Sequence, residues 1–173
     1  MGKGYIHVYT GNGKGKTTAM LGLALRAAGA GLKTYIGQFI KSGEYSEVKA
    51  IRRFLPDLTL EQYGTGRAFA AAKATEPEIA AAKDGLAKAA RALCSDSYDV
   101  IMLDEINVAV HLGLIPVGDA LDLIRRKPPH VELVLTGRDA APEIIEAADL
   151  VSDIAETKHY YNSGVAGRLG IEK

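Results

Sequence analysis

Apolar and polar positions follow two alternating patterns along this chain, and together they predict strands and helices in turn. Runs typical of buried or half-buried strands lie at 5–9, 33–39, 58–63, 98–103, 131–135 and 150–154. Between them, apolar residues recur every three or four positions at 19–30, 45–54, 75–93, 117–124 and 142–147, as in amphipathic helices. Strands that alternate with helices predict a mostly parallel sheet covered on both faces. We therefore expect a three-layer α/β/α fold.

Local signals refine this pattern. Thr75 and Glu78 have the spacing of a capping box at the start of the third helix, and Pro56 ends the second. The segment 98–103 is apolar almost throughout, which is typical of a strand buried on both faces. The segment 58–63 is more polar, so we expect it near an edge of the sheet.

Composition limits what the chain can be. With 173 residues, 47% of them hydrophobic, it is long enough for one core, and we expect one domain over residues 1–173. The 21 basic and 21 acidic residues balance, so no overall field favours nucleic acid or an anionic membrane as a partner. No apolar run approaches the roughly 20 residues of a membrane span, and the first predicted strand leaves no room for a signal peptide. With its single cysteine, Cys94, the chain is expected to be cytoplasmic.

A glycine-rich segment joins the first predicted strand to the first helix: Gly11-Asn12-Gly13-Lys14-Gly15-Lys16-Thr17-Thr18. Backbone N–H groups of such a turn can converge on phosphate oxygens, Lys16 can bridge them, and the Thr17 hydroxyl can bind Mg²⁺. The usual motif has glycine where this chain has Thr10. We therefore predict a variant phosphate-binding loop for a nucleoside triphosphate, with a turn that binds nothing as the alternative.

Two acidic residues, Asp104 and Glu105, follow the buried strand at 98–103. Ligands of parallel α/β sheets gather at the carboxyl ends of the strands, so both carboxylates should face the loop that carries Lys16 and Thr17. One could hold Mg²⁺ directly or through water, while the other orients water or substrate. Without the loop, the same pair would more often be a capping or surface feature.

Three cations are further candidates for binding anionic groups. Arg138, in the triplet 136–138 after another apolar strand, could clamp phosphate or carboxylate in a bidentate manner. Lys41 follows the second strand at the same predicted edge, and Arg26 lies at the far end of the first helix. An exposed surface charge is the alternative for each. The four histidines show no metal-ligand spacing, but the segment Lys158-His159-Tyr160-Tyr161 could cover a planar ligand or simply pack on the domain.

The order of the motifs resembles that of the P-loop-type corrinoid adenosyltransferases of bacteria and archaea, the ATP:cob(I)alamin or cob(I)yrinic acid a,c-diamide adenosyltransferase family. The resemblance spans nearly the whole chain and rests mainly on the loop 10–18. It extends to the segments 24–29, 38–41, 103–105, 136–138, 148–152, 158–159 and 170–172. It implies a P-loop NTPase fold of the RecA-like type. It also implies a reaction in which a Co(I) corrinoid attacks the 5′-carbon of ATP and expels triphosphate.

The resemblance further implies ligands, partners and roles. ATP would lie across the loop in the reverse sense to common P-loop enzymes, with Lys16 and Glu105 catalytic and Mg²⁺, or Mn²⁺ in its place, on Thr17, Asp104 and Glu105. The corrinoid would be cobalamin, cobinamide or an a,c-diamide precursor, a reductase would supply the electron, and the enzyme would be a homodimer. The expected nucleotide and corrinoid contacts are residues 11–18 with Arg26, Lys41, Phe69 and Arg138.

One segment departs from the family pattern. Better-known members carry Gly-x-Gly-Phe-x-Trp, whose aromatic residues help to exclude the lower axial ligand of cobalt, where this chain has Gly64-Thr65-Gly66-Arg67-Ala68-Phe69. Exclusion here could use Phe69 or another residue, or be tuned to a different corrinoid. A small P-loop kinase or NTPase that acts at the γ-phosphate, and a carrier that binds both ligands without turnover, are the alternative functions.

Overall fold

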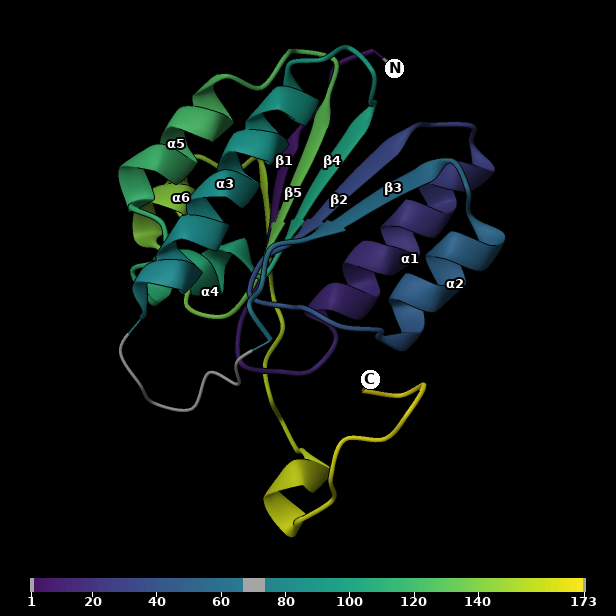
Figure 1. The fold of residues 1–173 in the computed structure, drawn as a ribbon, viewed down its shortest axis with the longest axis vertical. Helices are drawn as coiled ribbons and strands as arrows, with labels where there is room; N and C mark the ends of the chain where they lie inside the picture. Colours follow the sequence, from purple (N-terminus) through teal and green to yellow (C-terminus); the bar gives the residue numbers. More distant parts are fainter. Residues whose placement is uncertain (1, 67–73, 173) are drawn as a thin grey trace.

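The protein is represented by a computed structural model, in which residues 2–66 and 74–172 are described (Figure 1). Within them, six strands form one sheet in the order β3-β2-β4-β5-β1-β6, and every neighbouring pair is parallel. The strands are β1 (Ile6–Thr10), β2 (Thr34–Gln38), β3 (Leu58–Gln62), β4 (Val100–Asp104), β5 (Glu132–Thr136) and β6 (Leu150–Asp153). The helices are α1 (Lys16–Gly29), α2 (Ser46–Phe54), α3 (Glu76–Leu93), α4 (Ile106–His111), α5 (Val117–Arg125) and α6 (Pro142–Glu146), followed by the 3₁₀ turn η1 (Tyr160–Ser163).

The sheet separates two hydrophobic cores. Helices α1 and α2 cover one face, and α3 to α6 cover the other (Figure 1). Successive residues of β4 point to opposite faces, so Ile101 and Leu103 pack in one core while Val100 and Met102 pack in the other. This explains the continuous apolar run at 98–103 and confirms the expected three-layer α/β/α fold.

Most predicted elements are present, with differences at the boundaries. The strand β3 lies at an edge of the sheet, as its polar sequence indicated. The backbone N–H of Thr75 donates to the Glu78 carboxylate at 2.8 Å, which confirms the capping signal before α3. Helix α1 begins at Lys16 instead of residue 19, because the end of the phosphate-binding loop already has helical geometry. The short helix α4 and the turn η1 were not predicted.

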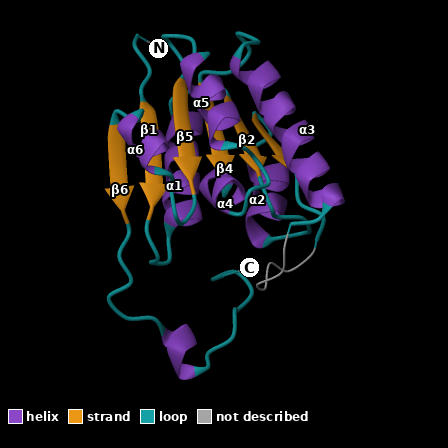
Figure 2. Ribbon diagram, turned by 90° about the vertical axis from the view of Figure 1, so that its left-hand side faces the viewer, coloured by secondary structure: helices purple, strands orange, loops and turns teal. Residues whose placement is uncertain are grey.

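The carboxyl ends of the strands form one edge of the sheet, and the C-terminal segment extends past this edge (Figure 2). After β6 the chain continues through η1 to Glu172, so that residues 155–172, here called the C-terminal tail, lie below the strand ends. The predicted contact Phe69, with the rest of the segment 67–69, lies outside the described residues. No helix in the described parts of the chain is long and apolar enough to cross a membrane.

A candidate nucleotide site at the carboxyl edge of the sheet

The loop between β1 and α1 is held against the chain that leaves β6. The N–H of Gly13 donates to the Ile154 carbonyl at 2.7 Å, and a Cβ at Gly13 would lie 2.6 Å from that same oxygen. Gly15 has φ +123°, a conformation that side chains with a Cβ rarely adopt. Both glycines are therefore required by the path of the loop.

Lys16 points back into this loop. Its Nζ donates to the carbonyl oxygens of Gly11 at 2.6 Å and Gly13 at 2.7 Å. Burial, and secondarily the positive charge of Arg138, lowers the pKa of Lys16. The loop thus carries an ammonium group at its centre, where an anion would meet it.

Asp104, the last residue of β4, is fully buried and accepts four hydrogen bonds. Its Oδ1 accepts from Thr136 at 2.7 Å and from Thr17 at 2.9 Å. Its Oδ2 accepts from Lys41 at 2.8 Å and from Gln38 at 3.1 Å. Each carboxylate oxygen already has two donors, so Asp104 positions its neighbours, and the direct contact with Mg²⁺ predicted for it would require one of these donors to leave.

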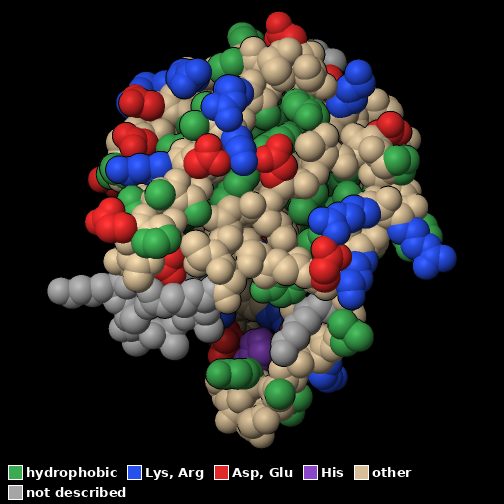
Figure 3. Space-filling view, viewed as in Figure 1, with side chains coloured by type: hydrophobic (Ala, Val, Ile, Leu, Met, Phe, Trp, Pro, Cys, Tyr) green, Lys and Arg blue, Asp and Glu red, His purple; other side chains and the backbone are tan. Residues whose placement is uncertain are grey.

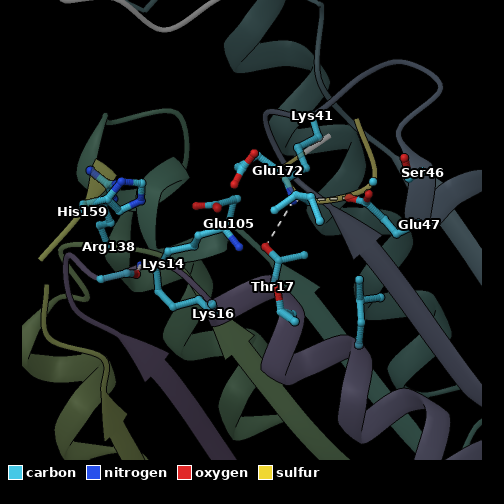
Figure 4. A pocket seen from close by; sticks show the side chains of 16 residues that line it. Lys14, Lys16, Thr17, Lys41, Ser46, Glu47, Glu105, Arg138, His159 and Glu172 are labelled. Atoms are coloured by element: carbon cyan, nitrogen blue, oxygen red, sulfur yellow. Dashed lines mark hydrogen bonds and ion pairs between the residues drawn. The ribbon is translucent and has the colours of Figure 1, made fainter. Parts of the chain in front are cut away.

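Glu105 follows in a left-handed conformation, with φ +60°, which is costly for a residue with a side chain. Its N–H donates to the Thr136 hydroxyl at 3.1 Å, a contact that supports this turn. Burial, and secondarily the charge of Asp104, raises the pKa of the Glu105 carboxyl group. The turn directs the Glu105 side chain into the same pocket as Lys16 and Thr17 (Figure 4).

These groups line an open pocket of about 500 Å³. Its lining comes from the phosphate-binding loop and the first two turns of α1, from Lys41 after β2, from Ser46 and Glu47 at the start of α2, and from Glu105 and Arg138. The C-terminal tail supplies the remaining wall with His159, Gly170, Ile171 and Glu172. Figure 3 shows the hollow between the tail and the body of the sheet.

Comparison with known proteins shows to which family this chain belongs. The model of the family described as "ATP:corrinoid adenosyltransferase BtuR/CobO/CobP" matches residues 2–172. The chain belongs to this family. It is 33% identical to the corrinoid adenosyltransferases of Pseudomonas aeruginosa and Escherichia coli K12, over 98% of this chain and 84% and 86% of theirs. It is 32% identical to the corrinoid adenosyltransferase CobA of Salmonella typhimurium, over 98% of this chain and 86% of that protein.

The structure brings most of the predicted site residues of this corrinoid adenosyltransferase together. The pocket is lined by residues 13–18 of the loop and by Lys41, Glu105 and Arg138, with Asp104 beneath them. Gly11 and Asn12 belong to the loop but not to the lining formed by the described residues. Arg26 is exposed in the last turn of α1, about 15 Å along the helix axis from Lys16 at roughly 1.5 Å per residue, and is not brought into the described lining.

The unusual residue Thr10 has a structural partner. It is the last residue of β1, it is buried, and its hydroxyl accepts a hydrogen bond from the N–H of Ala140 at 3.4 Å. Thr10 therefore links the start of the phosphate-binding loop to the loop after β5, which carries Arg138.

Several residues of the site had not been singled out. Gln38 and Thr136 bind Asp104, and both are polar residues at the end of a largely apolar strand, which was the signal available in the sequence. Glu172 lines the pocket although it lies 67 positions from Glu105; its segment 170–172 belongs to the family resemblance, but nothing in the sequence was a reason to place it beside Glu105. His159 also lines it, so its segment contributes to the site and not only to packing.

The donor set near Thr17 fits Mg²⁺. The Thr17 hydroxyl donates a hydrogen bond to Asp104, so the lone pairs of its oxygen are left to accept a hydrogen bond or bind a cation. They accept a hydrogen bond from Lys41 Nζ at 3.2 Å. The Glu105 carboxylate is the second oxygen donor facing the pocket. Mg²⁺ prefers oxygen ligands and is commonly held by one or two protein groups together with phosphate oxygens. Thr17 and Glu105 supply that number.

Proposed function

We propose that this chain transfers the 5′-deoxyadenosyl group of ATP to the Co(I) centre of a corrinoid and releases triphosphate. The observation that carries the proposal is one pocket in which Lys16 and Thr17 meet Glu105 and Arg138, in a chain that belongs to the ATP:corrinoid adenosyltransferase family. The acceptor would be cobalamin, cobinamide or an a,c-diamide precursor.

The reaction needs no nucleophilic side chain. The Co(I) corrinoid substrate supplies the electron pair that forms the Co–C5′ bond, and the C5′–O bond breaks with its electrons leaving on the triphosphate. The protein must therefore hold C5′ near cobalt and stabilise the negative charge that grows on the leaving group. Lys16 and the N–H groups of the loop are the donors placed for this task.

A bound Mg²⁺, or Mn²⁺ in its place, would neutralise part of the triphosphate charge. Thr17 and Glu105 would hold the ion, and Asp104 would act from behind by fixing the Thr17 hydroxyl, in agreement with the 2.9 Å contact between them. Lys16 would exchange the carbonyls of Gly11 and Gly13 for phosphate oxygens when the nucleotide binds.

The remaining cations would orient the ligand. Lys14, Lys41 and Arg138 line the pocket and could each contact an anionic oxygen. By the family resemblance, ATP would lie in the reverse sense across the loop, with Phe69 as a further contact. We also infer from the resemblance a homodimer and a reductase that supplies Co(I), and from the single cysteine, Cys94, we infer action in the cytoplasm.

The product distinguishes this reaction from its alternatives. The protein should be incubated with ATP, Mg²⁺ and chemically reduced cobalamin, and nucleotides and corrinoids separated afterwards. We expect triphosphate and a light-sensitive adenosylated corrinoid in equal amounts. ADP or orthophosphate without a Co–C bond would indicate a kinase or NTPase, and stoichiometric binding of both ligands without product would indicate a carrier.

A further inference from the structure

Three polar side chains lie side by side at the carboxyl edge of the sheet. Gln62 ends β3, Gln38 ends β2 and Asp104 ends β4, and in the parallel register Gln38 pairs with both of the others. Neighbouring strands are about 4.8 Å apart, which is within reach of side-chain hydrogen bonds. Gln38 and Asp104 are fully buried, whereas Gln62 is partly exposed at the edge.

The hydrogen bonds among these residues run in one direction. An ionised carboxylate only accepts, so the Gln38 amide must turn its NH₂ group to Asp104, at 3.1 Å. The Gln38 oxygen then accepts from the NH₂ group of Gln62 at 3.0 Å, and the Gln62 oxygen accepts from the backbone N–H of Gly43 at 3.1 Å. An acceptor at one end and a donor at the other therefore fix the orientation of both amides.

One end of this chain of hydrogen bonds lies at Asp104 beneath the candidate site, and the other lies in the connection that leads to its wall. Gly43, with φ +125°, belongs to the connection between β2 and α2 that also carries Lys41, and this connection leads directly to Ser46 and Glu47 in the pocket wall. At the other end, Asp104 holds the Thr17 hydroxyl and the Lys41 ammonium group. Gln62 itself is not part of the described pocket lining, and β2 separates its strand from β4, so it acts on the ligand only through others.

We propose that Gln62 is a positioning residue, which acts through Gln38 and the Gly43 turn to orient Asp104, Thr17 and Lys41 for the magnesium complex of triphosphate. The proposal rests on the proposed function, in which triphosphate is the leaving group. Loss of a partner behind a metal-binding group typically lowers metal affinity by about 10- to 100-fold. The effect should therefore appear in the contribution of Mg²⁺ to triphosphate binding.

Binding of inorganic triphosphate, measured by calorimetry on the full chain with Mg²⁺ and again with EDTA, tests this without corrinoid or turnover. Gln62→Glu keeps the shape of the side chain but removes the donor to Gln38, and Gln62→Met removes the donor without adding charge. Glu61→Gln is the matched control, because it changes the preceding residue of the same edge strand, outside the chain of hydrogen bonds.

We expect the ratio of the affinities with and without Mg²⁺ to fall about tenfold in both Gln62 variants and to stay within twofold of wild type in Glu61→Gln. The positioning role is overturned if the ratio is unchanged, if only Gln62→Glu lowers it, or if both affinities fall equally, as after general damage to the site. A wild-type protein that binds no triphosphate, with or without Mg²⁺, would instead refute the phosphate site of the proposed function and this inference with it.

Discussion

The hydroxyl of Thr17 donates a hydrogen bond to Oδ1 of Asp104 at 2.9 Å, across 87 positions of the sequence. This contact joins the phosphate-binding loop to the end of β4. It is also one of the contacts that define the role of Asp104. The two carboxylate oxygens of Asp104 accept hydrogen bonds from Thr17, Thr136, Gln38 and Lys41. Glu105 is thus the carboxylate that faces the pocket, and Asp104 is the buried group that orders the residues around it.

Replacing Lys16 should abolish productive use of ATP. Lys16→Ala removes the ammonium group at the centre of the loop, and loss of one preorganised charge-stabilising donor commonly costs about 10²- to 10³-fold in rate. We expect a loss of this size in kcat/KM for adenosylcorrinoid formation, with the far-ultraviolet circular dichroism unchanged. Lys83→Ala, at an exposed lysine of α3, is the control. Wild-type turnover by Lys16→Ala would show that our assignment of its role is wrong.

Glu105→Gln should weaken Mg²⁺-dependent activity by about tenfold or more, because a neutral amide is a poorer ligand for a hard cation. The melting temperature at neutral pH should be maintained or higher. Burial and Asp104 raise the folded-state pKa of Glu105, so the ionised form costs stability above its unfolded pKa, and the amide removes that cost. A large drop in melting temperature would contradict this electrostatic account.

The same raised pKa predicts a pH dependence of the wild-type enzyme. Glu105 must be ionised to bind a cation, so kcat/KM should fall on the acid side with a midpoint above the ordinary range of a glutamate. Rate profiles of wild type and Glu105→Gln check this, since the acid limb due to Glu105 should be absent from the variant.

Lys41→Met should destabilise the free protein and make it more responsive to Mg²⁺. Burial alone would lower the pKa of Lys41, but the Asp104 carboxylate at 2.8 Å raises it overall, so the pair is ionic. Removing one member of a buried ion pair costs about 3 kcal/mol, because the other charge is left without its partner. Thermal melts without nucleotide should show a larger upward shift with Mg²⁺ alone in the variant than in wild type. Equal shifts would contradict a cationic role of Lys41 beside Thr17.

Removing residues 156–173 should weaken ATP binding without unfolding the sheet. Hydrogen bonds and ion pairs that residues 156–172 make with described residues all stay within that segment, as in the contacts of Arg168 with Glu172 and of Asn162 with Glu156. Yet the tail forms one wall of the pocket. We expect KM for ATP to rise roughly tenfold, equivalent to about 1.4 kcal/mol, with little change in melting temperature. Leu169→Ala, at an exposed tail residue outside the lining, should stay within twofold.

A buried tyrosine pair should make the fold sensitive to alkali. The hydroxyls of Tyr35 and Tyr63 are hydrogen bonded to each other; burial raises the pKa of Tyr35 to about 12 and also raises the pKa of Tyr63. Tyrosines of the unfolded chain ionise near pH 10, so the stability from this pair is complete below about pH 10 and is lost as pH rises toward 12. Tyr63→Phe should flatten this decline by up to about 1.4 kcal/mol per pH unit in urea titrations. Tyr161→Phe, at an exposed tyrosine, should keep the wild-type slope.

The sequence by itself determined the order of strands and helices, the edge position of β3 and the place of the phosphate-binding loop. These features depend on apolar spacing and on glycine, proline and capping residues within a few positions of one another. Such short-range patterns can be recognised from the sequence alone. The short helix α4 escaped prediction because six residues carry too little periodicity and its start depends on the left-handed turn at Glu105.

Only the tertiary structure decided how the site is assembled. One row of side chains contains Gln62, Gln38 and Asp104 because of the strand register. Packing sets this register, and no local sequence pattern predicts it. That Asp104 holds Thr17 while Glu105 faces the pocket follows from burial and backbone conformation, although the two residues are adjacent acids in the sequence. The contribution of the tail to the pocket is also decided by tertiary structure. Contacts between segments that are distant in the sequence depend on how the sheet and its helices pack, and the sequence alone does not specify which residues become neighbours.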